Sequence, residues 1–192
     1  MPSHGFYDAG ALRQVATNLF HGWGYNFYRV ENQLRADDQL VRSKAGWLLG
    51  IAMASVDAAE TEYRREFLPA PSRTKPFPEA GAIAAAQRLE QLARGIGALE
   101  ALIQQQPAPE NDRMTQRYRQ EAPTLKVLID YDEQLVGQCD LLRSMVNGQD
   151  GASILKNPRD LESGLEAIRA TLHKREAVLF DRDAAKLVLH GR

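Results

Sequence analysis

The sequence predicts an all-α protein, a four-helix-bundle-like fold of two antiparallel helical hairpins in which the first helix is unusually long. Its 26 Ala and 23 Leu residues outnumber the 22 Val, Ile and Thr residues together, a composition that favours helix over strand. Apolar residues recur at steps of three and four, the spacing of an amphipathic helix, and no convincing run alternates with period two. Prolines gather in a few places and separate these periodic stretches. A chain of 192 residues is expected to form one helical domain.

The first two predicted helices span residues 25–68 and 79–105. Pro69 and Pro71 end the first helix, because proline lacks a backbone N–H and restrains the residue before it. The stretch 69–78 holds four prolines and is predicted to be a connector. The apolar stripe of the first helix contains Phe27, Val30, Leu34, Val41, Ala45, Leu48, Ala52, Val56, Ala59, Tyr63 and Phe67.

The last two predicted helices span residues 123–147 and 158–183, with a short helical piece over 114–121 before them. Pro123 suits the first turn of a helix, and the Asn147–Gly148 pair is typical of a turn that ends one. The two apolar stripes are Leu125, Leu128, Leu135, Cys139, Leu142 and Val146, and then Leu161, Leu165, Ile168, Leu172 and Leu179.

Small residues at every fourth position predict how the first two helices pack. The first helix carries Gly46, Gly50, Ala54 and Ala58, and the second carries Ala93, Gly97 and Ala101. Such ridges let two helix backbones approach closely. An antiparallel turn centred between Arg73 and Thr74 pairs Gly46 with Ala101, Gly50 with Gly97, and Ala54 with Ala93.

Charge and cysteine content limit the partners and the compartment. The chain has 24 basic and 25 acidic side chains, so no overall field attracts nucleic acid or anionic lipid, and neither partner is expected. The single Cys139 cannot form an intramolecular disulfide, and its place on an apolar stripe predicts a small core residue in a reducing, cytoplasmic compartment. The longest apolar stretch, 47–56, is too short to span a bilayer.

Motifs that carry catalysis or hold metals are not found in the sequence. It has no Glu-x-x-His unit, no glycine-rich phosphate loop and no Gly-x-Ser-x-Gly elbow, so no catalytic residue, metal site or cofactor is predicted. His173 is predicted to be a surface histidine. The acidic residues Asp130, Asp132 and Glu133 are predicted to lie on a solvated helix face.

One region is a candidate binding site. Seven of the 14 aromatic residues lie in the first 28 positions, and a charged segment follows them. The candidate ligand-binding or partner-binding residues are His21, Trp23, Tyr25, Tyr28, Arg29, Glu31, Asn32, Arg35, Asp38 and Arg42. On a helix, Glu31 can meet Arg35 and Asp38 can meet Arg42, since each pair is four residues apart.

Two interpretations of this segment stay open. It is either an exposed face of salt bridges worth about 0.3 to 0.5 kcal/mol each, or a recognition surface, since Tyr, Trp and Arg dominate binding hot spots. Asp37 favours the second, because it is placed on the apolar seam between Leu34 and Val41, where a carboxylate requires a buried partner such as Arg29 or a residue from another helix.

The leading functional hypothesis is a non-catalytic scaffold, assembly factor or accessory protein that acts through protein contacts, either by self-association or with a protein partner. The alternative is an enzyme or small-ligand-binding protein whose pocket is lined by segment 21–42. A homodimer is expected at the start of the first helix. In the predicted register position 106 lies opposite position 41, so the second helix leaves the apolar residues Phe27, Val30 and Leu34 without cover. The two later helices, the piece at 114–121 or a second copy could cover them, and a second copy is favoured because two-fold pairing lets the segment cover its own counterpart.

Overall fold

The computed structural model describes residues 3–20, 34–73, 76–106 and 122–180. Within these ranges the chain forms α-helices and one short 3-10 helix, with no strand, which confirms the predicted all-α bundle. The elements are η1 (Ser3–Tyr7), α1 (Ala9–Phe20), α2 (Leu34–Phe67), α3 (Ala80–Gln105), α5 (Ala122–Val146), α6 (Gly151–Ile154) and α7 (Pro158–Phe180). The expected start of the first helix at 25–33, the short piece at 114–121 and the tail after 180 lie outside the described residues.

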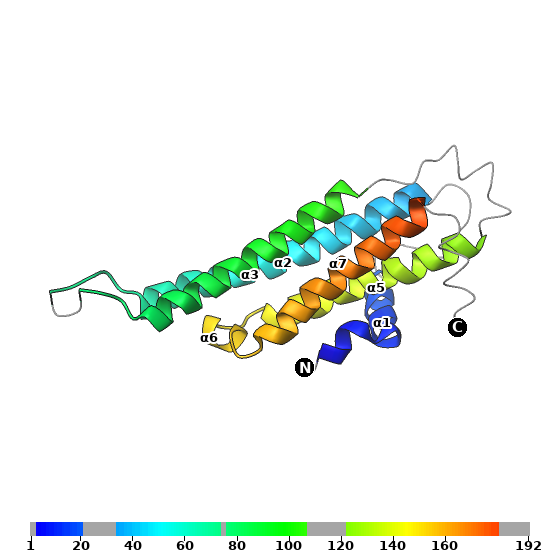
Figure 1. Ribbon diagram of the computed structural model, residues 1–192. Helices are drawn as coiled ribbons and strands as arrows, with labels where there is room; N and C mark the ends of the chain where they lie inside the picture. Colours follow the sequence, from blue (N-terminus) through cyan, green and yellow to red (C-terminus); the bar gives the residue numbers. More distant parts are fainter. Residues whose placement is uncertain (1–2, 21–33, 74–75, 107–121, 181–192) are drawn as a thin grey trace.

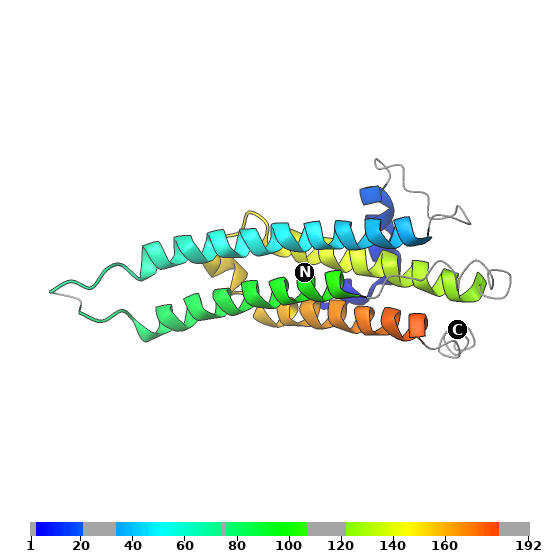
Figure 2. The ribbon, with the colours of Figure 1, turned by 90° about the horizontal axis from the view of Figure 1, so that it is seen from above.

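The four long helices, α2, α3, α5 and α7, lie side by side along the molecule (Figure 1). α2 and α3 form one antiparallel hairpin, and α5 and α7 lie against it: α2 packs on α5, α5 on α7, and α3 on α7. α1 crosses the outer side of α5 and packs on it (Figure 2). The bundle is therefore two hairpins with an additional N-terminal helix across one of them.

The α2–α3 hairpin is longer than the hairpin that it packs against. α2 has 34 residues and α7 has 23, so their lengths are about 51 Å and about 35 Å at the helical rise per residue. The difference places the far end of the α2–α3 hairpin beyond α6 and beyond the start of α7 (Figures 1 and 2).

The core consists of the apolar stripes of the four long helices, which meet along the bundle axis. Leu48, Ile96 and Ile168 are among the side chains that are almost fully buried. Cys139 is also buried, as predicted, and burial raises the pKa of its thiol. The described residues include no helix with the length and apolar character needed to cross a membrane.

The predicted pairing of small-residue ridges between the first two helices is wrong. Three of the seven ridge residues are exposed, namely Ala54, Ala58 and Ala101. A Cβ added at Gly46 would lie 2.8 Å from Gln104 Nε2, and one added at Gly97 would lie 3.1 Å from Met53 Sδ. Each glycine therefore makes room for a longer side chain of the opposite helix, instead of facing another small residue.

The N-terminal elements η1 and α1 use two other glycines as close contact points. A Cβ added at Gly137 of α5 would lie 2.6 Å from the Leu12 carbonyl oxygen of α1, and one added at Gly164 of α7 would lie 2.6 Å from the Phe6 ring. Gln138 Nε2 donates to the Phe6 carbonyl at 3.0 Å. The N-terminal segment is thereby attached to α5 and α7.

A short helix, α6, forms between α5 and α7, where the sequence predicts only a connector. Asp150 caps it, since its Oδ1 accepts from the Ser153 backbone N–H at 2.7 Å. At its first residue, Gly151, an added Cβ would lie 2.9 Å from Leu89 and 3.1 Å from Tyr63. α6 thus covers the seam between α2 and α3 near the far end of their hairpin.

Candidate functional site

Most of the predicted site lies where the structure gives no description. Outside the described residues are His21, Trp23, Tyr25, Tyr28, Arg29, Glu31 and Asn32. The expected dimer residues Phe27 and Val30 also lie outside them, and the side chains of Leu34, Arg35 and Asp37 are not described. The structure therefore places only Asp38 and Arg42 of the predicted binding residues.

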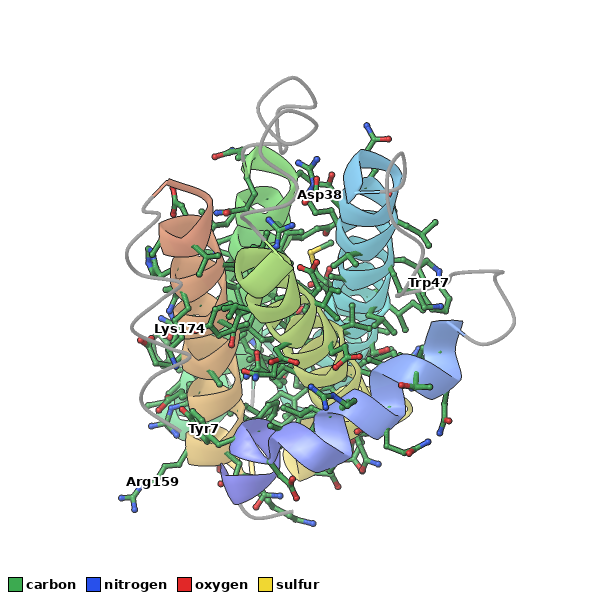
Figure 3. The ribbon with its side chains drawn as sticks, turned by 90° about the vertical axis from the view of Figure 1, so that its right-hand side faces the viewer. Tyr7, Asp38, Trp47, Arg159 and Lys174 are labelled. Carbon is green, nitrogen blue, oxygen red and sulfur yellow. The ribbon has the colours of Figure 1, made fainter. Side chains whose placement is uncertain are left out.

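Asp38 and Arg42 form the ion pair that their spacing predicts, with 2.6 Å between Asp38 Oδ2 and Arg42 Nη2. The pair is not on an exposed face, because Asp38 is only 2% exposed. Viewed from this end of the bundle, Asp38 lies on the inner side of α2 and Trp47 on its outer side (Figure 3). For these two residues the interpretation as an exposed row of salt bridges is wrong.

Asp38 belongs to a buried network of charges that joins the helices at this end of the bundle. Arg175 of α7 pairs with Asp38 through Nη2, and its Nε donates to Asp132 Oδ1 of α5 at 2.7 Å. Arg42 Nη1 donates to the Gln106 carbonyl, next to the end of α3, at 2.8 Å. We call the four charged residues Asp38, Arg42, Asp132 and Arg175 the ion network. Its two carboxylates and two guanidinium groups balance in charge.

Burial and pairing compete in setting the protonation of the network. Burial raises the pKa of Asp132, and the neighbouring Arg175 only partly opposes that rise. For Arg175, burial acts to lower the pKa, but Asp132 and Asp38 together outweigh it and the pKa is raised. Within the described part of the chain, Arg42 Nε and Arg175 Nη1 are buried without a hydrogen-bond acceptor. The network is thus compact and nearly, but not fully, satisfied.

The acidic run on α5 is not the solvated face that the sequence predicts. Asp132 pairs with Arg175, and Glu133 is buried, with its Oε2 2.5 Å from Arg13 Nε of α1. Arg13 also pairs with Asp130. Burial raises the pKa of Glu133, and the neighbouring Arg13 partly opposes that rise. These acidic side chains attach α1 and α7 to α5.

A pattern in the sequence could have indicated the ion network. Each of three apolar stripes has a gap of seven positions, from Leu34 to Val41, from Leu128 to Leu135 and from Leu172 to Leu179. A charged residue stands three or four positions from both ends of each gap: Asp38, Asp132 and Arg175. A charged side chain on the inner stripe must be paired when it is buried. The apolar spacing alone had indicated Asp37 as the seam residue instead.

The opposite end of the molecule carries exposed apolar side chains that were not predicted from the sequence. Phe77, in the connector between α2 and α3, is 86% exposed, Phe67 is 45% exposed and Ile83 is 36% exposed. The Phe67 ring lies against Tyr63, with 4.6 Å between ring centroids. We call Tyr63, Phe67, Phe77 and Ile83 the hairpin end. The available signal was an aromatic residue between two prolines, Pro76-Phe77-Pro78, in a connector that needs no core residue.

Two other large side chains are exposed in different places, Tyr7 on η1 and Trp47 on α2. Lys44 Nζ lies 4.1 Å from the centre of the Trp47 ring, a cation–π contact, and burial lowers the pKa of Lys44. Single exposed aromatic residues of this kind are common on soluble proteins. The hairpin end differs from them because several exposed apolar side chains occur at the same end of one hairpin.

In the described part of the chain, no group of three or more His, Cys, Asp or Glu side chains could hold a metal ion. His173 is on the surface, as predicted, with 70% of its side chain exposed.

Comparison of the chain with protein-family models, with curated proteins and with solved structures finds no match.

Proposed function

We propose that this chain is a non-catalytic helical-bundle protein of the cytoplasm, a scaffold or assembly factor that binds another protein at its hairpin end. The observation that supports this proposal is the group of exposed apolar side chains Phe67, Phe77 and Ile83 at the projecting end of the α2–α3 hairpin. Contiguous exposed apolar surface on a soluble protein marks an interaction site more often than an isolated residue does.

The composition and setting of the hairpin end suit a protein partner. Aromatic side chains are enriched in the centres of protein interfaces. Pro76 and Pro78 flank Phe77, and each proline restricts the backbone, so less conformational entropy is lost when Phe77 is bound. The projecting hairpin leaves room for a partner beside it, because α5 and α7 do not reach this far (Figure 2).

The charged groups at the other end of the bundle support a structural role instead of a ligand pocket. A pocket for an acidic ligand needs guanidinium groups that face the ligand. Arg42 and Arg175 are directed at Asp38, Asp132 and the Gln106 carbonyl, and their charges are balanced within the chain. No described contact therefore favours the alternative of an enzyme or ligand-binding protein.

Photo-crosslinking in the producing cell tests the proposal. A benzophenone amino acid would replace Phe77 in one variant, Tyr7 in a second and Arg159 in a third, since all three side chains are exposed. We expect light-dependent protein adducts, identified by mass spectrometry, from position 77 and none above background from positions 7 and 159. Equal adduct yields at the three positions, or none at position 77, would contradict the proposal.

A further inference from the structure

The exposed face of the hairpin end continues the seam between α2 and α3. Closer to the middle of the bundle, other helices of the same chain cover this seam. α6 closes the seam where Gly151 lies against Leu89 and Tyr63. Beyond that point the stripe of α2 continues to Phe67, and the adjacent surface of α3 continues to Ile83, both exposed. The uncovered surface is therefore an extension of the interface between the two hairpins, not a separate patch.

The cover that is missing has the form of a second helical hairpin. Along the rest of the bundle, the α2–α3 hairpin is covered by α5, α6 and α7, which together with it make a four-helix core. At the hairpin end only α2 and α3 remain (Figure 1). The same end of a second copy supplies two helices with the same spacing and the same apolar residues.

The charges around the hairpin end also suit a second copy. Residues 60–90 contain five basic and five acidic side chains, so the segment is neutral overall. Several of them already alternate in sign across the surface, since Arg64 pairs with Glu60 and Glu90, and Arg65 lies 3.9 Å from Glu62. Two such surfaces do not repel each other, whereas a partner with charge of one sign, such as nucleic acid or anionic lipid, gains no long-range attraction.

We infer, resting on the proposed function, that the protein bound at the hairpin end is a second copy of this chain. Two hairpin ends pack around a two-fold axis, and Phe67 and Phe77 of one copy cover the exposed Ile83 surface of the other. Such an interface is isologous, because the same residues contribute from both sides. It lies at the other end of α2 from the dimer contact that the sequence predicts.

The mass of the purified protein in solution, measured over a range of concentrations, tests this inference. The chain has a mass of 21.4 kDa, and we expect the wild type to have twice that mass at micromolar concentration. We expect the double variant Phe67→Asp, Phe77→Asp to have the mass of one chain, and Tyr7→Asp, the matched exposed aromatic control, to remain a dimer. Circular dichroism checks that each variant keeps its helix content. Phe77→Asp alone, outside the helices, replaces the double variant if folding is impaired.

The outcomes distinguish this inference from the proposed function. A wild type that stays monomeric at high micromolar concentration overturns the inference. A dimer that keeps its mass in both the Phe67→Asp, Phe77→Asp double variant and the Phe77→Asp variant overturns it as well. If the wild type is monomeric while position 77 forms adducts with a different protein in the cell, the proposed function stands and the second copy is excluded. If position 77 forms no adducts and the wild type is monomeric, both the proposed function and the inference are wrong.

Discussion

Arg175 in α7 pairs with Asp38 in α2, 137 positions earlier in the chain, and each of the two residues is only 2% exposed. The contact joins the two hairpins of the bundle across its core. Because Arg175 also binds Asp132 of α5, one guanidinium group connects three helices at this end. Removing it would leave Asp132 buried without a cation and Asp38 paired with Arg42 alone.

Replacing Arg175 by Met should therefore destabilise the protein strongly, by about 3 to 5 kcal/mol, the usual result of leaving one side of a buried ion pair unpaired. Urea denaturation would measure the free energy of unfolding. Arg169→Met is the matched control, since Arg169 pairs with Glu166 on the exposed face of the same helix. That change should cost about 1 kcal/mol at most.

The buried pair of Arg175 and Asp132 allows a test of the reason for this loss of stability. Adding Asp132→Asn to Arg175→Met removes the carboxylate that is left without a cation, and part of the lost stability should return. A double variant less stable than Arg175→Met by the full loss measured for Asp132→Asn alone would show that the two residues contribute independently, contrary to the pairing of Arg175 with Asp132.

Close packing of α1 on α5 depends on Gly137. A Cβ added there would lie within 2.8 Å of three Leu12 atoms, two of them backbone atoms that cannot turn aside. Gly137→Ala should lower the free energy of unfolding by about 1 to 3 kcal/mol, the usual cost of overpacking.

Gly50→Ala is the control for that substitution, because the nearest atom to an added Cβ is Glu100 Oε1 at 4.0 Å. Alanine has a higher helix propensity than glycine, so this change should leave stability unchanged or raise it by up to about 1 kcal/mol. Equal stability of the two alanine variants would show that α1 does not pack on α5 at Gly137.

The Cys139 thiol should resist modification in the folded protein. It is buried, and burial raises its pKa, so both access and the reactive thiolate are suppressed. A thiol reagent should label it slowly in buffer and rapidly in denaturant. Phe77→Cys, at an exposed position, provides a second thiol that should react at once. Rapid loss of both thiols in the native protein would contradict the burial of Cys139.

The cap of α6 should make stability depend on pH in the acid range. The Ser153 backbone N–H lowers the pKa of Asp150 in the folded state, so the ionised cap stabilises the fold above the unfolded-state pKa of about 3.9. That contribution is lost as the pH falls through the lowered folded-state pKa. Thermal melts should show Asp150→Ala melting below the wild type at neutral pH, with the difference disappearing in strong acid.

Asp57→Ala removes an exposed carboxylate from the middle of α2 and serves as the control. Its melting temperature should stay close to that of the wild type across the same pH range. A difference between wild type and Asp150→Ala that grows as the pH falls would contradict the assigned direction of the shift.

The sequence by itself determined the helices, because their signals are local. Steps of three and four put Leu48, Leu142 and Ile168 on the inner faces, and the prolines after Phe67 end α2, whatever the neighbouring helices do. The burial of Cys139 follows from the same periodicity. These features need no knowledge of which helix lies beside which.

Only the tertiary structure decided how the helices meet. The rotation of each helix about its axis placed Met53 over Gly97, where ridge spacing alone suggested another glycine. It also brought Asp38, Asp132 and Arg175 together, since charges on three separate stripes can pair only when the stripes face one another at the same height. The exposure of Phe67 and Ile83 has a similar origin. Both residues lie on or near the inner stripes of α2 and α3. They are uncovered because α6 and α7 do not extend to the far end of the longer α2–α3 hairpin. Periodicity is set by hydrogen bonds within a helix, whereas register and cover depend on side-chain packing between residues far apart in the chain.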